Sequence, residues 1–454
     1  MAGKSANMSA TDRETGISAI LRLSLPLVAS ALITAINGFT DNFFLARHSE
    51  PALRAALPAN VFAGCVTTLV VSVLGYCGTM FARAHGGRRP AHAVAITANG
   101  LLLAAASSAV FAAAIPSARL VLGLFGHADD IAGLEYTLSS IVLAGGPLAA
   151  VAAVSAGFFS GQGLTKTVGL ATFLGVSVKI ALTPALVFGI GPLPELGIAG
   201  AGYSFIVSQC VVCSVYVASG SRNPLARQAV HHLRLLKFRP QIAAEILRFG
   251  GPLCGRTLVG YGSFFTLVAL LGRLDAAPAA ASTAIFAINC PFNAVIMGTS
   301  EGIEILCGRR MGEGNLSAVA RTVKSGCCLA AVLSIAYIVA LALFGQTVLG
   351  WFLSDEAKFD TSAFYAAGRG VVAMLMLRIT FEFMQNVFQA ALRGIGNTRA
   401  VFYSGVIVSL AAWIPGFVVV TYLMPTAAAY WAIMVATSIV GGATCLTLLV
   451  RSMK

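Results

Sequence analysis

Long apolar runs separated by short polar segments fill this 454-residue chain from residue 17 to residue 450. A helix needs about 20 mostly apolar residues to cross the hydrocarbon core of a bilayer. Applied along the chain, this rule predicts twelve membrane-spanning helices and leaves no long stretch for a soluble domain. The predicted spans are 17–44, 55–81, 91–115, 131–159, 167–190, 197–219, 243–271, 279–308, 318–345, 364–392, 400–424 and 427–450.

Short motifs near the predicted span ends recur along the sequence at nearly constant offsets of 226 and 233 residues. The recurring pairs are 20–27 with 246–253, 83–86 with 309–312, and 159–166 with 392–399. Each half contains six spans, an even number, so both halves begin on the same side of the membrane. They are therefore predicted to be parallel repeats related by an axis along the membrane normal, a plan used by secondary transporters.

The repeats define the expected domain organisation. Residues 1–16 are polar, without the features of a signal peptide, and are expected to form a disordered tail. An N-terminal six-helix lobe covers 17–219, a basic cytoplasmic linker covers 220–242, and a C-terminal six-helix lobe covers 243–450. The predicted fold class is an all-α membrane protein of two lobes with a cavity between them.

Composition and charge agree with a membrane protein. The chain is 57% hydrophobic and 10% charged, against about 25% charged residues in a typical soluble domain. Its net charge of +13 raises a nucleic-acid hypothesis. With a cytoplasmic N-terminus, however, 21 of the 30 Lys and Arg residues lie on the cytoplasmic side, six on the other side and three within spans. This asymmetry predicts a plasma or inner membrane location with both termini cytoplasmic, basic loops facing anionic lipid, and no nucleic-acid partner.

A polar stripe interrupts the tenth span. Arg378, Glu382, Gln385 and Gln389 are spaced by four, three and four residues and share one helix face. A charge at the bilayer centre costs about 2.5–3.5 kcal/mol on insertion scales, so the stripe must face protein or a water-filled cavity. Two interpretations stay open: a structural Arg378–Glu382 pair, or a cavity in which Glu382 takes up a coupling ion.

A second stripe lies in the first span, where Thr34, Asn37 and Asp41 are spaced by three and four residues. Loss of solvation raises the pKa of a carboxyl group and a nearby cation lowers it, so a carboxyl group at membrane depth can exchange a proton near neutral pH. Asp41 is therefore a candidate coupling residue. The alternative is a solvated carboxylate at the outer helix end.

The fifth span carries Lys179 and, four residues later, Thr183. An unpaired ammonium at this depth is implausible, so Lys179 needs an acidic partner, and Asp41 is the predicted one. The pair is either structural, or it opens when Asp41 is protonated or when an anionic substrate binds Lys179.

The second half adds further polar candidates. Asn289, Asn293, Glu301 and Glu304 share a face of the eighth span, and Arg256 lies in the seventh. As coupling carboxylates we rank Glu382 first, Glu301 second and Glu304 third, because Glu304 is close to basic residues at the cytoplasmic end. The cysteine spacings lack the second ligand pair of a zinc site, so neither a metal site nor a cofactor is expected.

The sequence resembles the multidrug and toxic compound extrusion (MATE) family along essentially its full length. The residues that carry the resemblance are LSLPLVAS and FTDNFF in the first span, SGQGLTK and LRGIGNTR after the fourth and tenth spans, LPELGIAGAGYS (193–204) and RRMGEGN (309–315). The resemblance implies V-shaped lobes and cation- or proton-driven export by alternating access.

The resemblance also assigns functional positions of the family to residues of this sequence, and at some of these positions the sequence differs from the family. Asp41 matches the family's first-span aspartate, and Glu382 matches its acidic position in the tenth span. Lys179 and Thr183 stand where the family often has Asn and Asp. Near Gly260 the sodium-coupled branch has an acidic residue, and this sequence has none close to that position.

We therefore expect a monomeric antiporter, and not an enzyme, that exports a small organic solute in exchange for protons, with sodium as the alternative ion. Lys179 makes a substrate with an anionic group conceivable. Alternatives are a lipid-linked-precursor flippase of the same superfamily and, more remotely, a membrane-embedded enzyme.

Overall fold

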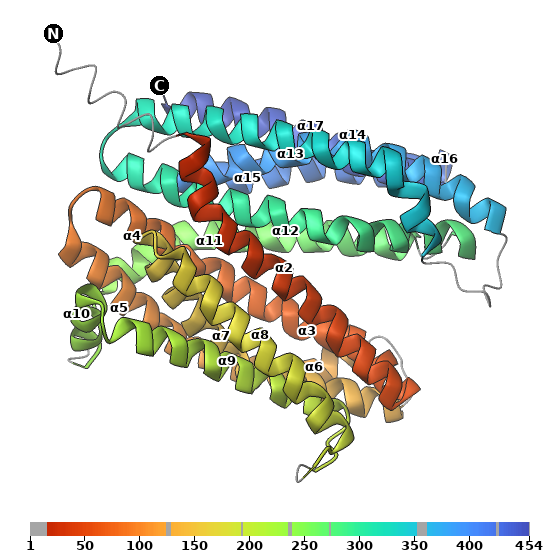
Figure 1. The fold of residues 1–454 in the computed structure, drawn as a ribbon, viewed down its shortest axis with the longest axis horizontal. Helices are drawn as coiled ribbons and strands as arrows, with labels where there is room; N and C mark the ends of the chain where they lie inside the picture. The colour runs from red at the N-terminus through yellow and green to blue at the C-terminus, as the bar shows by residue number, and fades with distance from the viewer. Residues whose placement is uncertain are drawn as a thin grey trace. The chain divides into compact units, whose positions relative to one another are not determined.

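The computed structural model of the chain describes residues 16–123, 129–191, 194–234, 238–271, 274–351, 361–423 and 426–453. Within these ranges all regular structure is helical (Figure 1). The helices are α2 (Ile17–His48), α3 (Glu50–Gly75), α4 (Cys77–Gly86), α5 (Pro90–Ala106), α6 (Ser108–Gly123), α7 (Asp129–Gly161), α8 (Thr165–Phe188), α9 (Ile198–Gly220), α10 (Pro224–Arg234), α11 (Pro240–Leu271), α12 (Ala276–Gly312), α13 (Leu316–Gly350), α14 (Thr361–Gly394), α15 (Thr398–Val408), the π-helix η1 (Ser409–Trp413), α16 (Ile414–Leu423) and α17 (Ala427–Met453).

The helical fold class predicted from the sequence is confirmed. In the described part of the chain, eleven helical stretches are long and apolar enough to cross a membrane, one for each predicted span except 243–271. That span is the 32-residue α11. It is long enough to cross the hydrocarbon core of a bilayer. The predicted tail, residues 1–16, lies outside the described residues except for its last position.

The turns that recur in the sequence also recur in backbone geometry. Gly163 and Gly396, 233 positions apart, both adopt a left-handed φ, +84° and +88°. Arg88 and Gly314, 226 positions apart, do the same at +54° and +72°. The hydrogen bonds follow the same offsets: Leu164–Phe159 and Asn397–Leu392 close one pair of turns, and Gly87–Arg83 and Glu313–Arg309 close the other. The repeated motifs therefore encode equivalent turns.

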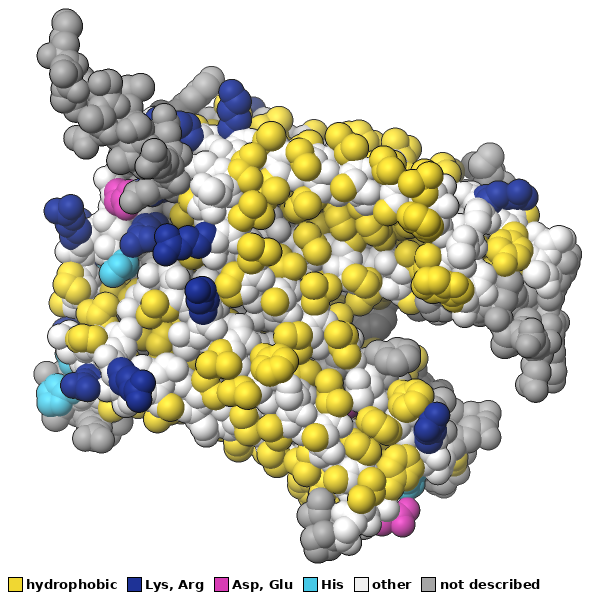
Figure 2. Space-filling model, in the orientation of Figure 1, with side chains coloured by type: hydrophobic (Ala, Val, Ile, Leu, Met, Phe, Trp, Pro, Cys, Tyr) yellow, Lys and Arg dark blue, Asp and Glu magenta, His cyan; other side chains and the backbone are white. Residues whose placement is uncertain are grey.

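The helices form two compact units. Leu25–Cys254 make one, called here the N-terminal unit, and Gly255–Lys454 with Met1–Ser24 make the C-terminal unit. The start of α2 joins the C-terminal unit because Ser24 donates a hydrogen bond to the carbonyl of Thr299 (3.4 Å). On the face drawn in Figure 2, apolar side chains cover the middle of the N-terminal unit, and Lys and Arg side chains lie toward the end that carries α10.

Glycines let α4 and α7 touch backbone to backbone in the N-terminal unit. A Cβ atom added to Gly157 would lie 2.7 Å from the Cα of Gly78, and one added to Gly78 would lie 2.6 Å from the Cα of Gly157. Since both neighbours are backbone atoms, neither can rotate away. This contact fixes the crossing of the two helices.

Substituting Gly157→Ala is therefore expected to lower the free energy of unfolding by about 1–3 kcal/mol, the usual effect of overpacking. Thermal unfolding of the purified protein in detergent measures this change. Gly133→Ala on the same helix is the matched control, because its Cβ would meet nothing within 4 Å. Equal melting temperatures for the two variants would contradict the contact.

Candidate functional site

The predicted partner of Lys179 is present in the N-terminal unit. The Lys179 ammonium of α8 donates a hydrogen bond to a carboxylate oxygen of Asp41 on α2. The Lys179 side chain is 6% exposed and the Asp41 side chain 16% exposed. The second carboxylate oxygen of Asp41 is buried and has no hydrogen-bond partner among the described residues. The pair thus leaves an acceptor available to a further ligand.

This ion pair lines a cavity of about 230 Å³. Around the charges, α3 contributes polar or small residues at helical spacing: Asn60, Gly64, Thr67 and Thr68. Space beside Gly64 is open, since an added Cβ would meet nothing within 4 Å. Charged and polar groups around an open volume at membrane depth are typical of a path or binding site for a polar solute or ion.

Neighbouring side chains hold Lys179 in place. The Thr183 hydroxyl, one turn along α8, donates to the Lys179 carbonyl (2.8 Å) and shares a hydrogen bond with the Ser204 hydroxyl of α9 (2.9 Å). The ammonium also lies 5.9 Å from the centre of the Phe205 ring, within reach of a cation–π contact. Thr183, predicted as a cavity residue, therefore supports the backbone that carries the lysine.

In the C-terminal unit, Arg378 and Glu382 form an ion pair along α14, with 2.5 Å between the guanidinium nitrogen and carboxylate oxygen. Both side chains are largely buried, 12% and 11% exposed. The other carboxylate oxygen of Glu382 is buried without a hydrogen-bond partner in the described part of the chain. In each unit, one buried carboxylate thus pairs with one cation and keeps one oxygen unused.

The rest of the predicted α14 stripe is buried as well. Gln385 and Gln389 are 8% and 6% exposed. Gln385 faces α17, where a Cβ added to Gly441 would lie 2.0 Å from its amide nitrogen. On α12, Asn289 is 4% exposed with an unsatisfied amide oxygen, whereas Asn293 is half-buried.

The two remaining carboxylate candidates differ from each other. Glu304 accepts a hydrogen bond from the Arg393 guanidinium of α14 (2.6 Å). The expectation that Arg309 and Arg310 explain its environment missed this partner, which lies 89 residues away in sequence. Glu301 is exposed on α12 and makes no ion pair within the described ranges. The ranking of Glu301 above Glu304 stays a prediction.

Arg256 on α11 is a half-buried cation. Its aliphatic stem packs where Gly405 of α15 leaves room, since an added Cβ would lie 2.4 Å from the arginine Cδ. The Nε atom is buried, and it has no hydrogen-bond partner among the residues that the structure describes. Cys445 of α17 is a close electrostatic neighbour. The glycine therefore accommodates a guanidinium inside the unit.

Sequence reasoning missed several residues near the site, and two of the residues that it named stay predictions. Asn60, Thr67 and Thr68 form a polar face on α3 that their spacing of seven and eight residues could have revealed. Glu135 of α7 is a fully buried acidic residue of the N-terminal unit that the sequence analysis did not single out. Thr34 is exposed and bonds its own helix, at the Ser30 carbonyl (2.9 Å). The side chain of Asn37 lies outside the described residues.

Helices long and apolar enough to span a membrane, internal repeats and a buried charge pair beside a cavity together define the class of polytopic membrane transporters. The comparisons with known proteins identify the family. The model of the MatE family matches residues 26–185 and 252–418. The chain therefore belongs to the MATE family of transporters, as the sequence motifs predicted.

Individual relatives and solved structures match this chain over nearly its whole length. The chain is 30% identical to the probable multidrug resistance protein NorM of Pseudomonas aeruginosa over 94% of this chain and 87% of that protein. A MOP superfamily transporter from Pyrococcus furiosus, described as having a binding pocket of reverse polarity, has a TM-score of 0.86 at 19% identity. A MATE crystal structure in a bent conformation has the same TM-score at 18% identity. Both matches cover 98% of this chain and 97% of the solved chain.

Proposed function

We propose that this protein is a secondary active antiporter that exports a small organic solute by alternating access, driven by an inward proton gradient. The observation that carries the proposal is the Asp41–Lys179 ion pair on the wall of a polar cavity. Family membership supports transport, and the name of the Pseudomonas aeruginosa relative supports drugs or similar organic molecules as solutes.

The pair gives a physical route for coupling. A proton on Asp41 removes the negative charge that compensates the Lys179 ammonium. A buried charge without a partner is strongly unfavourable, at about 3–5 kcal/mol for removing one partner of a buried pair. Protonation therefore favours a conformation that hydrates Lys179, or a substrate that supplies the missing negative charge. Arg378 and Glu382 offer the same chemistry in the C-terminal unit.

Proton coupling is favoured over sodium coupling because the buried sites offer few oxygen ligands for Na⁺. Na⁺ is a hard cation that needs several oxygen ligands. The carboxylates of both buried pairs already face a cation, and α11 carries no acidic residue near Gly260. We place both termini in the cytoplasm of a plasma or inner membrane, because Lys and Arg concentrate in the loops on that side, and expect a monomer.

Solute counterflow into liposomes that contain the purified protein tests the proposal. Transport of a fluorescent organic solute that carries an anionic group is expected when a pH gradient is imposed and not when a sodium gradient is imposed alone. Transport driven only by sodium would overturn the proton coupling. Gradient-independent movement of a lipid-linked precursor would favour the flippase, and chemical conversion of the solute would favour an enzyme.

A further inference from the structure

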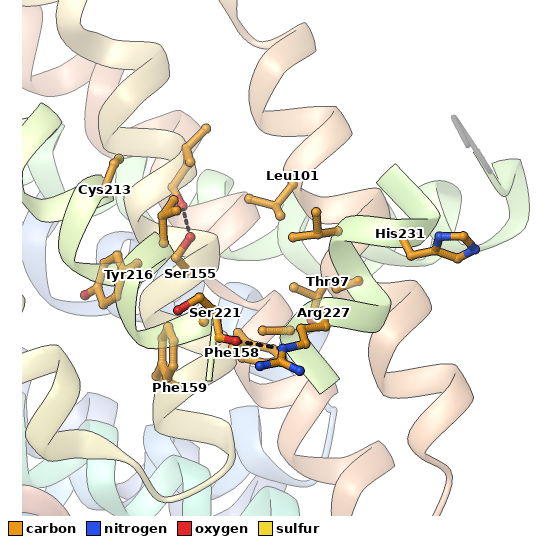
Figure 3. Close-up of a pocket in the computed structure, with 16 residues that line it drawn as sticks. Thr97, Leu101, Ser155, Phe158, Phe159, Cys213, Tyr216, Ser221, Arg227 and His231 are labelled. Carbon is orange, nitrogen blue, oxygen red and sulfur yellow. Dashed lines mark hydrogen bonds between the residues drawn. The ribbon is translucent and has the colours of Figure 1, made fainter. Parts of the chain in front are cut away.

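A second cavity in the N-terminal unit plays no part in the proposed transport chemistry. It has a volume of about 620 Å³ and lies beneath α10, with walls from α5, α7, α9 and α10 (Figure 3). Such a volume is typical of small-molecule sites, which span about 300–1,000 Å³. The lining is mainly apolar and includes Leu101, Val151, Phe158, Phe159 and Tyr216. Its occupant must therefore present mostly hydrocarbon.

Polar contacts hold α10 over this cavity at both ends. Before the helix, the Asn223 amide donates to the Gln162 side-chain oxygen (2.8 Å), in the turn after α7. The Asn223 oxygen also caps α10 by accepting from the Leu225 amide (3.0 Å). After the helix, the Arg239 amide donates to the Asn99 side chain of α5 (2.8 Å). The space beneath α10 is therefore framed by specific bonds.

The cavity borders an exposed apolar surface of α9 and α10. Val217 of α9 lines it and is 74% exposed, and Val230 of α10 lines it and is 44% exposed. Exposed apolar side chains on a spanning helix face acyl chains in a membrane. A hydrocarbon chain can therefore enter from the bilayer without crossing a polar barrier.

The rim of the cavity is basic. Arg227, an exposed residue, lines it, and its Nε donates to the Ser221 carbonyl (2.7 Å), which orients the guanidinium (Figure 3). His231 follows four residues later on the same helix. The segment 220–242 carries five Lys and Arg residues and no acidic residue. Basic segments next to a spanning helix attract anionic lipid headgroups, at about 1 kcal/mol per charge.

We propose that the cavity binds one anionic glycerophospholipid, with an acyl chain beneath α10 and the phosphate at Arg227. The apolar lining selects the chain, and the basic rim selects the headgroup. Since α10 belongs to the segment that joins the two sequence halves, a bound lipid would hold this helix against α5 and α9. This proposal does not depend on which solute or ion is transported.

Native mass spectrometry of the purified full-length protein tests the headgroup part. Phosphatidylglycerol and phosphatidylcholine with identical acyl chains are titrated separately. We expect one phosphatidylglycerol to be retained more tightly than phosphatidylcholine. Arg227→Glu should weaken its retention by about five- to thirtyfold, the effect of one or two surface charges. Arg222→Glu is the matched control, because this exposed arginine lies in the same segment and does not line the cavity.

A cavity-filling variant tests the acyl-chain part. Ala226→Phe on α10 places a ring in the cavity, and Gln228→Phe places the same ring on an exposed position of α10 that does not line it. Only Ala226→Phe should lose the bound lipid, with thermal unfolding measured for both variants. The proposal is overturned if Ala226→Phe retains the lipid, if Arg227→Glu and Arg222→Glu behave alike, or if soluble glycerophosphoglycerol binds as tightly as the whole lipid.

Discussion

Asp41→Asn is expected to abolish gradient-driven export and to destabilise the protein. The substitution leaves the Lys179 ammonium buried beside a neutral amide, and loss of one partner of a buried pair costs about 3–5 kcal/mol. Export is measured in liposomes under a pH gradient, and stability by thermal unfolding in detergent. Glu195→Gln is the control, because Glu195 pairs with His48 at the surface and is 67% exposed.

Removing both charges separates stability from transport. In the double variant Asp41→Asn with Lys179→Met, no buried charge is left without a partner. We expect most of the lost stability to return, because replacing a whole buried pair is often neutral or stabilising. Export should remain absent, since neither a proton site nor a cation faces the cavity. A double variant that exports at the normal rate would show that the pair is only structural.

Glu382→Gln is expected to abolish export as well, while the protein folds. The carboxylate is buried in α14, pairs with Arg378 and keeps one oxygen without a partner among the described residues. Glutamine preserves the shape and removes the ability to exchange a proton. Initial export rates at several imposed pH gradients, with reconstituted protein quantified in each liposome batch, measure the effect.

The matched control for Glu382 is a carboxylate in another arginine pair. Glu313→Gln changes a partially exposed residue that accepts from Arg310 (2.7 Å). Because Glu313 lies in a turn that helix capping already closes, this variant should export normally. Normal export by Glu382→Gln would remove Glu382 from the mechanism, and equal loss in both variants would indicate a general effect of arginine pairing.

Most of the fold could be predicted because membrane helices are encoded by local composition. The predicted spans lie within described helices, to within a few residues at most ends. Three spans, however, consist of more than one helix: 91–115 covers α5 and α6, 400–424 runs over α15, η1 and α16, and 55–81 covers α3 and α4, which meet at Tyr76. No proline marks this break. The helix α10 was missed because its composition is polar, although Asn223 followed by Pro224 is a common helix start.

The site could be predicted only where local chemistry demanded a partner. An ammonium at membrane depth requires an acid, and the sequence offered Asp41 for Lys179. No sequence feature predicted the Glu304–Arg393 pair. Arg393 follows the predicted tenth span, in the LRGIGNTR motif, and the pair forms because α12 packs on α14. Threonines such as Thr67 are equally hard to recognise as site residues, because their hydroxyls donate hydrogen bonds within their own helix. The Thr67 hydroxyl donates to the Ala63 carbonyl (2.8 Å).

The equivalent turns make it possible to superimpose one half of the chain on the other by residue number. At the offset of 226, Asp41 corresponds to Leu267, and at the offset of 233, Lys179 corresponds to Ala412. In the reverse direction, Arg378 and Glu382 correspond to Gly145 and Ala149. The two halves thus share equivalent turns, whereas their buried charges stand at non-equivalent positions. The two ionic centres are therefore not interchangeable, and each can evolve its own affinity without altering the other.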